Sequence, residues 1–313
     1  MYFETAGIEV NPFIPPLVAF AISFLTSMGG VSGAFLLLPF QMSFLGYTSP
    51  SVSATNQLFN IIAIPSGVYR YVKEGRMVWP LTWVVIVGTL PGVLIGAIIR
   101  VRYLPDPRNF KFFVGLVLLY IGLRMLQDIF LKKQGKNKQV SAEEEFQKMV
   151  QEFHKKKEGH KLPAVQIKEF SLFKISYDFY GRNFTINTVG IFILSAIVGI
   201  IGGVYGIGGG SIIAPFFISF FGLPVYTVAG AALMGTFVTS VAGVAFYQAI
   251  APFYPSMAVA PDWMLGILFG IGGTAGMYLG ARAQKFMPAK AIKLILAACI
   301  FFVAGKYILS FFT

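Results

Sequence analysis

The sequence contains few charged residues. They make up 12% of its 313 residues, about half the share found in soluble domains, whereas hydrophobic residues make up 56%. A soluble core of this size could not bury so much apolar surface, but a helix that spans a bilayer can be apolar on every side. The apolar runs, of about 14 to 24 residues, exceed the roughly 10-residue strands of a membrane barrel. The composition therefore predicts an all-α polytopic membrane protein.

Cysteine, histidine and intramembrane acidic residues are also rare. The single Cys299 allows no intrachain disulfide and no thiolate metal site. The two histidines lie among lysines in the centre of the chain, so we interpret them as solvated side chains and not as metal ligands. Asp and Glu are absent from 179 to 261, and no Ser-His-Asp, Cys-His or clustered carboxylate arrangement occurs. We therefore expect no enzyme activity, no metal and no cofactor.

Basic residues outnumber acidic ones by 25 to 13, which gives a net charge of +12. Twelve of the 25 lie in one hydrophilic stretch, 132–182, and the others flank hydrophobic segments. This distribution follows the positive-inside rule for membrane proteins and argues against nucleic-acid binding. We therefore expect the lipid bilayer as a partner, no nucleic acid, and a cytoplasmic location for the central stretch.

Ten hydrophobic segments surround this stretch and divide the chain. Residues 1–131 form a first membrane repeat, 132–187 a cytoplasmic insert, and 188–313 a second membrane repeat. The second and seventh segments are short for full spans, and a glycine-rich stretch precedes each, so broken or half-length helices are expected there. The predicted segments are 13–29, 33–46, 52–71, 78–99, 109–131, 188–204, 209–222, 226–250, 263–284 and 289–312.

The two halves are related by a constant offset of 176 residues, which aligns glycines, prolines and aromatic residues. With eight further residues inserted near 251–256, a second set of glycines also aligns. The pairs are Gly30/Gly206, Gly33/Gly209, Pro39/Pro215, Phe40/Phe216, Gly46/Gly222, Gly67/Gly243, Tyr71/Tyr247, Gly88/Gly272, Gly92/Gly276 and Gly96/Gly280. This pattern predicts an internal repeat.

Loop charge favours opposite orientations for the two repeats. With five segments per half, 19 basic residues face the cytoplasm, and only Arg100, Arg102, Arg108 and Lys111 lie in an outside loop. The alternative is that the two segments flanking each glycine-rich stretch form one broken helix. The halves would then be parallel, and the basic cluster 282–293 would face outward, against the positive-inside rule. Re-entrant hairpins would leave the inverted arrangement unchanged, so the number of spans stays open.

The insert carries a strand pattern. Alternating apolar residues over 173–179, a turn at Gly181-Arg182-Asn183 and a second strand at Phe184–Ile186 predict a hairpin. Ser141 and Glu144 form a capping box before a predicted helix. This helix plus hairpin either caps the cytoplasmic face or acts as a regulatory or partner-binding module.

The glycine-rich stretch 202–210 is the clearest break within the membrane. The sequence argues against a dinucleotide loop, because the flanks are apolar helices and the required acidic residue is missing. A helix starting near Ser211 would present free N–H groups and a positive dipole end, which suit an anion. Paired breaks of this kind hold substrates in inverted-repeat transporters. Close helix packing by small residues is the alternative.

Polar residues gather in the third and eighth segments. Asn56, Gln57 and Asn60 lie in the third, and Thr236, Thr239 and Ser240 in the eighth, where uncharged donors could bind an oxyanion. Hydrogen bonding between helices is the alternative. Pro65 should kink the third segment and free a carbonyl.

The breaks, each followed by a proline, and a run of small residues before a tyrosine form a repeated motif. Its residues are Gly30, Gly33 and Pro39 in the first half, and Gly206–Gly210, Pro215, Ala231–Gly243 and Tyr247 in the second. This motif resembles the signature of the TauE/SafE sulfite exporter family. The first half departs from it, with fewer glycines and with Ala-Thr-Asn-Gln at 54–57 in place of a Thr-Ser pair. The resemblance implies transport of sulfite, thiosulfate or organosulfonates across a prokaryotic inner membrane.

The residues predict a secondary transporter of a small anion that works by alternating access, and the resemblance implies that the anion contains sulfur; a homodimer is a candidate assembly. A membrane sensor or assembly protein acting through the insert is the alternative, and an intramembrane enzyme ranks third. The candidate substrate-binding residues are Gly30, Gly33, Asn56, Gln57, Asn60, Gly206, Gly209, Ser211, Thr236, Thr239 and Ser240, and the candidate breaks or kinks are Pro39, Pro65 and Pro215.

Overall fold

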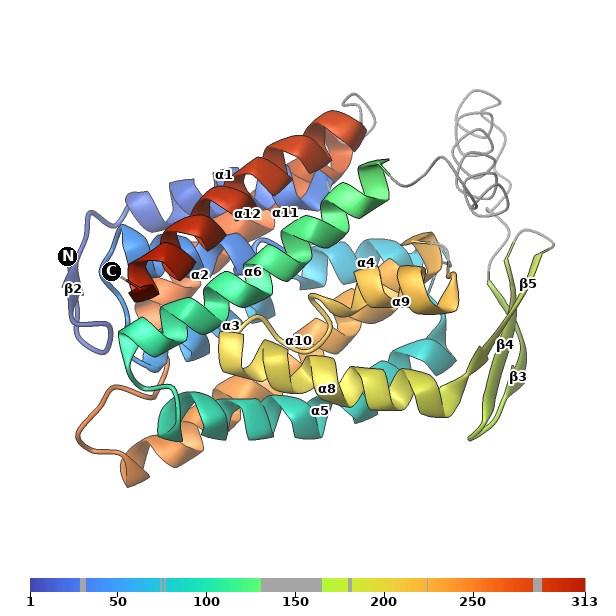
Figure 1. Ribbon diagram of the computed structural model, residues 1–313, viewed down its shortest axis with the longest axis horizontal. Coiled ribbons are helices and arrows are strands. Elements are labelled where there is room, and N and C mark those ends of the chain that lie inside the picture. Colours follow the sequence, from blue (N-terminus) through green and yellow to red (C-terminus); the bar gives the residue numbers. More distant parts are fainter. Residues whose placement is uncertain are drawn as a thin grey trace.

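Apolar helices dominate the computed structural model in Figure 1. The structure describes residues 1–28, 32–73, 75, 77–130, 165–179, 182–223, 225–283 and 289–312. The helices of the first half are α1 (Ile14–Met28), α2 (Ala34–Ser43), α3 (Ser51–Ala63), α4 (Pro65–Lys73), α5 (Trp79–Arg102) and α6 (Pro107–Phe130). Those of the second half are α8 (Thr188–Tyr205), α9 (Ile213–Phe221), α10 (Val225–Ile250), α11 (Trp263–Ala283) and α12 (Ala289–Phe312), with a short 3-10 turn, η2 (Ala251–Phe253), after α10.

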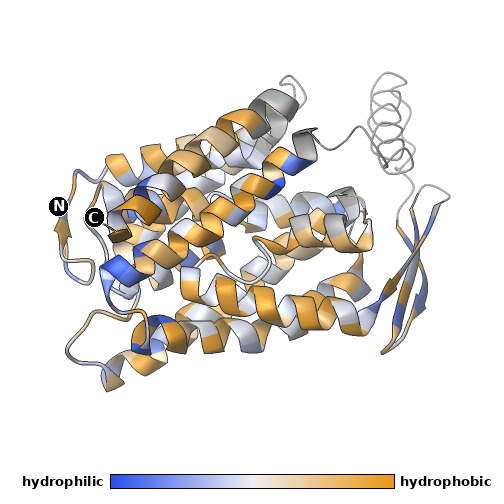
Figure 2. Ribbon diagram, in the orientation of Figure 1, coloured by the Kyte–Doolittle hydropathy of each residue, from blue (hydrophilic) through white to orange (hydrophobic). Residues whose placement is uncertain are grey.

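Six of the described helices are long and apolar enough to cross a membrane: α5, α6, α8, α10, α11 and α12. By contrast, α2 has 10 residues and α9 has 9, so each is too short for a full span. Apolar residues cover the helices, and hydrophilic ones gather mainly at the ends of the bundle and in the sheet at one end of it (Figure 2). The prediction of an all-α polytopic membrane protein with short helices after the glycine-rich stretches is confirmed.

Glycines let two pairs of helices pack with their backbones in contact. A Cβ on Gly92 would lie 2.5 Å from the carbonyl oxygen of Ala196, and one on Gly96 would collide with that of Ile200, so α5 fits tightly along α8. The corresponding glycines of α11, Gly276 and Gly280, meet the backbone of α1 in the same way. These contacts are the close packing by small residues that is typical of membrane helices.

Equivalent helices of the two halves run in opposite directions where they touch. In α3 and α10, Gln57 lies against Gly243 while Asn60, further along α3, contacts Ser240. In α6 and α12, Gly115 packs on Tyr307, and the later Gly122 packs on the earlier Ile300. Both pairs are therefore antiparallel, as Figure 1 also shows for α6 and α12.

Prolines occupy the three positions at which breaks or kinks were predicted, Pro39, Pro65 and Pro215. The first helix of the predicted third segment ends at Ala63, and α4 begins at Pro65, which has no N–H to continue the hydrogen-bond ladder. Pro39 lies inside α2 and Pro215 in the first turn of α9, and both helices continue beyond them. At these two positions the chain is interrupted before the short helix and not at the proline.

The described part of the insert is a three-stranded antiparallel sheet, formed by β3 (Gln166–Phe170), β4 (Lys174–Phe179) and β5 (Arg182–Asn187). The predicted hairpin is present, but its second strand already begins at Arg182, because that residue pairs with Phe179. The exposed edge strand β3 was not predicted, since its sequence is short and largely polar. The predicted helix after Ser141 lies outside the described residues.

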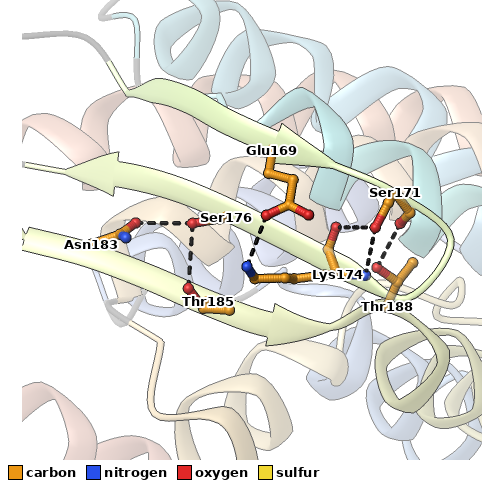
Figure 3. Close-up of polar contacts among 7 residues, drawn as sticks. All are labelled: Glu169, Ser171, Lys174, Ser176, Asn183, Thr185 and Thr188. Carbon is orange, nitrogen blue, oxygen red and sulfur yellow. Dashed lines mark hydrogen bonds and ion pairs between the residues drawn. The ribbon is translucent and has the colours of Figure 1, made fainter.

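Polar contacts join the strands of the sheet to one another and to the start of α8 (Figure 3). Lys174 forms an ion pair with Glu169 across β3 and β4, at 2.8 Å. Thr188, the first residue of α8, donates a 3.0 Å hydrogen bond to the carbonyl of Ser171 in the β3–β4 turn. On β4, the buried hydroxyl of Tyr177 pairs with that of Thr227 in α10 at 2.9 Å. The sheet is thus attached to two helices of the second half. A short hairpin of β1 (Tyr2–Phe3) and β2 (Ile8–Glu9) lies at the N-terminus.

The glycine contacts predict a clear difference between two glycine substitutions. Gly96→Ala should lower the free energy of unfolding by about 1–3 kcal/mol, because its Cβ collides with the α8 backbone. Gly305→Ala in α12 has open space around the new Cβ and should be neutral or slightly stabilising. Thermal unfolding in detergent measures both, and equal midpoints for the two variants would contradict the packing described.

Candidate functional site

The chain breaks between α8 and α9 in the middle of the bundle. Helix α8 ends at Tyr205, and Gly206 and Gly208 take left-handed φ angles of 81° and 75° that other residues rarely adopt. The next helix, α9, begins at Ile213, two residues later than expected from Ser211. The Ser211 hydroxyl instead donates back to the carbonyl of Ile207, which keeps the chain in turns before the helix starts.

The break is held in place by three helices that approach its backbone. A Cβ on Gly206 would lie 2.5 Å from the backbone of Ser53 in α3, and one on Gly208 would lie 2.9 Å from Ser240 in α10. Gly209 lies against Thr89 of α5 in the same manner. A side chain at any of these glycines would push the helices apart, so glycine is required for contact as well as for conformation.

The equivalent break of the first half leads into α2. Gly33 precedes this helix, and the predicted Gly30 lies outside the described residues. Beside it, the Ser32 hydroxyl donates a 2.9 Å hydrogen bond to the side-chain oxygen of Asn60 and accepts one from the N–H of Ala34. The entry to α2 is thus hydrogen-bonded to the polar face of α3.

Two amides on one face of α3 connect the two breaks. The side-chain nitrogen of Asn56 donates at 3.0 Å to the carbonyl of Ala34 and at 3.0 Å to that of Gly206. One turn later, the nitrogen of Asn60 donates to the carbonyl of Ile207 at 3.0 Å and contacts the Ser240 hydroxyl at 3.4 Å. Both N–H donors of Asn56 are used in these bonds, so in this conformation Asn56 holds α3 to the chain at both breaks.

Hydroxyl groups of α10 form hydrogen bonds with polar groups on the other side of the second break. The backbone N–H of Gly209 donates to the Thr239 hydroxyl at 3.0 Å, and the hydroxyls of Ser211 and Thr236 lie 3.3 Å apart. Thr236, Thr239 and Ser240 are fully buried, and Ser211 is 8% exposed. The structure therefore brings the candidate residues Asn56, Asn60, Gly206, Gly209, Ser211, Thr236, Thr239 and Ser240 into one buried network.

Gln57 is the exception among the polar residues of this crossing. Its amide is fully buried, yet neither its nitrogen nor its oxygen has a hydrogen-bond partner. The amide rests against Gly243 of α10, one turn from the contact between Asn60 and Ser240. A buried amide without partners costs about 1–3 kcal/mol for each unsatisfied group. Among the candidate residues that the structure describes, Gln57 is the side chain whose hydrogen-bonding capacity is unused.

Several residues of the network were not expected from the sequence. Thr89 is a fully buried hydroxyl between the packing glycines of α5, and Ser53 donates to the carbonyl of Val204 at 3.3 Å. Gln41 of α2 donates to Asn56 at 3.3 Å. An amide in the apolar run of a half-length helix is the signal that would have identified Gln41, whereas the positions of Thr89 and Ser53 depend on how the helices pack.

The arrangement offers neutral donors and acceptors without a carboxylate. Among the described residues no group of three or more His, Cys, Asp or Glu side chains could hold a metal ion. Its hydroxyls, amides and helix N-termini suit the binding of a small anion through dipoles. Groups for nucleophilic or acid–base catalysis are not assembled within this network.

Substitution of a break glycine should be more harmful than substitution of a turn glycine with the same backbone angle. Gly46 has φ of 69° and nothing within 4 Å of a new Cβ, so Gly46→Ala should cost about 1–2 kcal/mol for conformation alone. Gly208→Ala adds collisions with Thr236 and Ser240, for about 1–3 kcal/mol more. Thermal unfolding of the two variants tests this, and an equal loss would show that the break is not tightly enclosed.

Comparison with known proteins gives one result that covers most of the chain. The sequence model of the sulfite exporter TauE/SafE family matches residues 16–307. Comparisons with curated proteins and with solved structures found no match. The match includes both glycine-rich stretches, both short helices and the polar faces of α3 and α10. The chain therefore belongs to the TauE/SafE family of membrane transporters of sulfur-containing anions.

Proposed function

We propose that this chain is a secondary transporter that moves sulfite or an organosulfonate across the prokaryotic inner membrane by alternating access. The observation that carries the proposal is Gln57, a fully buried amide without a partner at the crossing of α3 and α10. The surrounding network is neutral and holds two broken helices together. Such a site can bind an oxyanion with hydrogen bonds and release it again, because no opposite charge retains it.

The substrate would be held by unused donors. The nitrogen of Gln57 supplies two unused N–H groups, whereas the N–H groups of Ala34 and Ile213, at the starts of α2 and α9, bond Ser32 and Gly210. The positive dipole ends of these helices favour negative charge. When the anion binds, Asn60, Thr236 and Ser240 would break hydrogen bonds within the protein and form hydrogen bonds to the anion instead. The family membership supports a sulfur-containing anion as this substrate.

The two repeats are proposed to have inverted topology, with 132–187 in the cytoplasm. The antiparallel crossings of α3 with α10 and of α6 with α12 support this, since each pair joins equivalent helices of the two halves. The repeat also relates α1 to α8 and α5 to α11, so the packing of α5 on α8 is equivalent to the packing of α11 on α1. A rotation that exchanges the halves would interchange the inward-open and outward-open states, which is the geometry of alternating access.

The present arrangement corresponds to a closed site. The amides of α3 and the hydroxyls of Thr236, Thr239 and Ser240 are fully buried, so an anion could not reach them without movement. Separation of α3 from α10 on one side would expose Gln57. The cost of its unsatisfied amide favours such an opening when an anion is available to bind it.

The first test of this site is Gln57→Leu. Removing an unsatisfied buried amide should leave the unfolding temperature unchanged or raise it, while sulfite flux into proteoliposomes should fall by about tenfold or more, because one charge-assisted hydrogen bond is lost. Gln248→Leu is the matched control, since that amide lies on the exposed face of α10 and its flux should stay at the wild-type level. Wild-type flux in a folded Gln57→Leu variant would remove Gln57 from the site.

The second test removes the polar pair that the repeat aligns. Asn60→Ala combined with Thr236→Ala deletes the donors of both halves at the crossing, and transport of sulfite and sulfonates should be abolished. Folding is checked by size-exclusion chromatography and thermal unfolding. If the folded double variant transports at the wild-type rate, the central network is structural and the binding site lies elsewhere.

A further inference from the structure

Arg100 is a buried cation at one end of the bundle. Loop charge places it in an outside loop, but it lies in the last turn of α5 and is fully buried. This turn is at the end of the bundle where both termini of the chain lie (Figure 1). The neighbouring Arg102 is exposed, as a loop charge should be.

The contacts of Arg100 do not balance its charge. One Nη donates to the carbonyl of Thr48 at 3.0 Å, the other donates to the carbonyl of Leu104, and the ring of Phe110 covers one face, with its centroid 3.7 Å away. The Nε has no partner. Among the described residues no carboxylate lies within salt-bridge distance of the guanidinium. Carbonyl dipoles and a ring supply partial charge only.

Asp262 is the acidic residue that is buried at this end of the bundle, whereas Asp106, in the loop after α5, is exposed. Asp262 is 3% exposed, and its carboxylate accepts hydrogen bonds from the N–H groups of Ala6 and Leu265 at 3.2 and 3.0 Å. It therefore caps the start of α11. Removing a charge from water without a counter-charge is strongly unfavourable, so an anion from solution would be a favourable partner for Arg100.

Polar side chains connect Arg100 with the central network. Tyr47 precedes Thr48, whose carbonyl bonds Arg100, but its hydroxyl is bonded to Ser51 and Thr55. Tyr247 packs with Ala97 and Val101 of α5 beside Arg100. The Tyr247 hydroxyl donates to the carbonyl of Gly203 at 3.4 Å, next to Ser53, which lies against Gly206 of the break. Along α5, Arg100 is about 16 Å from Thr89, which contacts Gly209. A line of hydroxyls thus leads from the cation to the second break.

We propose that Arg100 is the cationic contact of a second anion site, which binds a small oxyanion on its way between solution and the central network. The proposal rests on the transport function proposed above. Tyr247 would turn its hydroxyl from the carbonyl of Gly203 to the same anion, and the free Nε edge of Arg100 would complete its binding. A cation at the end of the pathway attracts anions, and the neutral network beyond it does not trap them.

A purely structural Arg100 makes different predictions. If its only role is to bond the carbonyls of Thr48 and Leu104, then anions in solution should have no effect on it, and its loss should reduce stability alone. If it binds an anion, the wild-type protein should be stabilised by sulfite, and that stabilisation should depend on the charge at residue 100. Sulfite-dependent unfolding therefore separates the two roles without any measurement of transport.

The binding test follows the unfolding temperature during sulfite titration at constant ionic strength, with gluconate as the replacement anion. In wild type and Arg100→Lys the unfolding temperature should rise with the logarithm of the sulfite concentration, whereas Arg100→Gln should need about tenfold more sulfite to reach the same fixed rise, which we call the sulfite midpoint. Arg102→Gln, which removes the same charge from an exposed position two residues away, should behave as wild type. An unchanged sulfite midpoint in folded Arg100→Gln would overturn the proposal.

If Arg100→Gln does not fold, Tyr247→Phe decides the question. It removes one hydroxyl from the proposed site and leaves both carbonyl bonds of Arg100 in place. We expect the sulfite midpoint to rise several-fold, and a wild-type midpoint would refute the second site.

Flux measurements then separate this proposal from the proposed function. Absence of sulfite and sulfonate flux in wild type would reject the transport function, while the unfolding titration would still report on Arg100. With wild-type flux present, Arg100→Gln should raise the half-saturating sulfite concentration by about tenfold. Unchanged half-saturation in Arg100→Gln would reject the second site and leave the transport function intact.

Discussion

The close approach of the Gly206–Gly210 segment to α3, α5 and α10 is the contact on which the rest of the structure depends. Because four of its five residues are glycines, this segment can leave the helical conformation inside the bundle and expose carbonyls and N–H groups to neighbouring helices. The amides of Asn56 and Asn60 bond the carbonyls, and Thr239 accepts from an N–H. Larger residues would separate the helices and leave these groups unsatisfied in an apolar environment.

The two halves are related in backbone but differ in chemistry. The repeat aligns Asn56 with Ala232 and Asn60 with Thr236, so the first half supplies amides where the second supplies a methyl group and a hydroxyl. An amide reaches further and bonds two carbonyls at once, which allows Asn56 to join both breaks. Asn56 and Asn60 thus give α3 hydrogen bonds to both breaks, while the amide of Gln57 has no hydrogen-bond partner.

Sequence patterns were sufficient for the helices and for most of the central residues. Long apolar runs and glycine clusters have direct physical consequences in a bilayer, so the spans, the short helices and the hairpin at 174–187 could be predicted. The hydrogen-bond partners of the polar residues could not be predicted, because the bonds from α3 to residues 206–207 join segments some 150 residues apart. The burial of Arg100 was missed for the same reason: charge counting treats a residue near a helix end as solvated, whereas here Phe110 and the carbonyls of Thr48 and Leu104 enclose it.

The central claim is that a small oxyanion binds at the crossing of α3 and α10 beside the second break. Selenite has the same pyramidal shape and a similar charge to sulfite, and its selenium gives an anomalous diffraction signal that no native atom of this chain produces. Crystals grown with selenite should show an anomalous peak within hydrogen-bond distance of Gln57 and of the 206–211 segment. Selenite bound to the protein with no peak at this crossing would contradict the account.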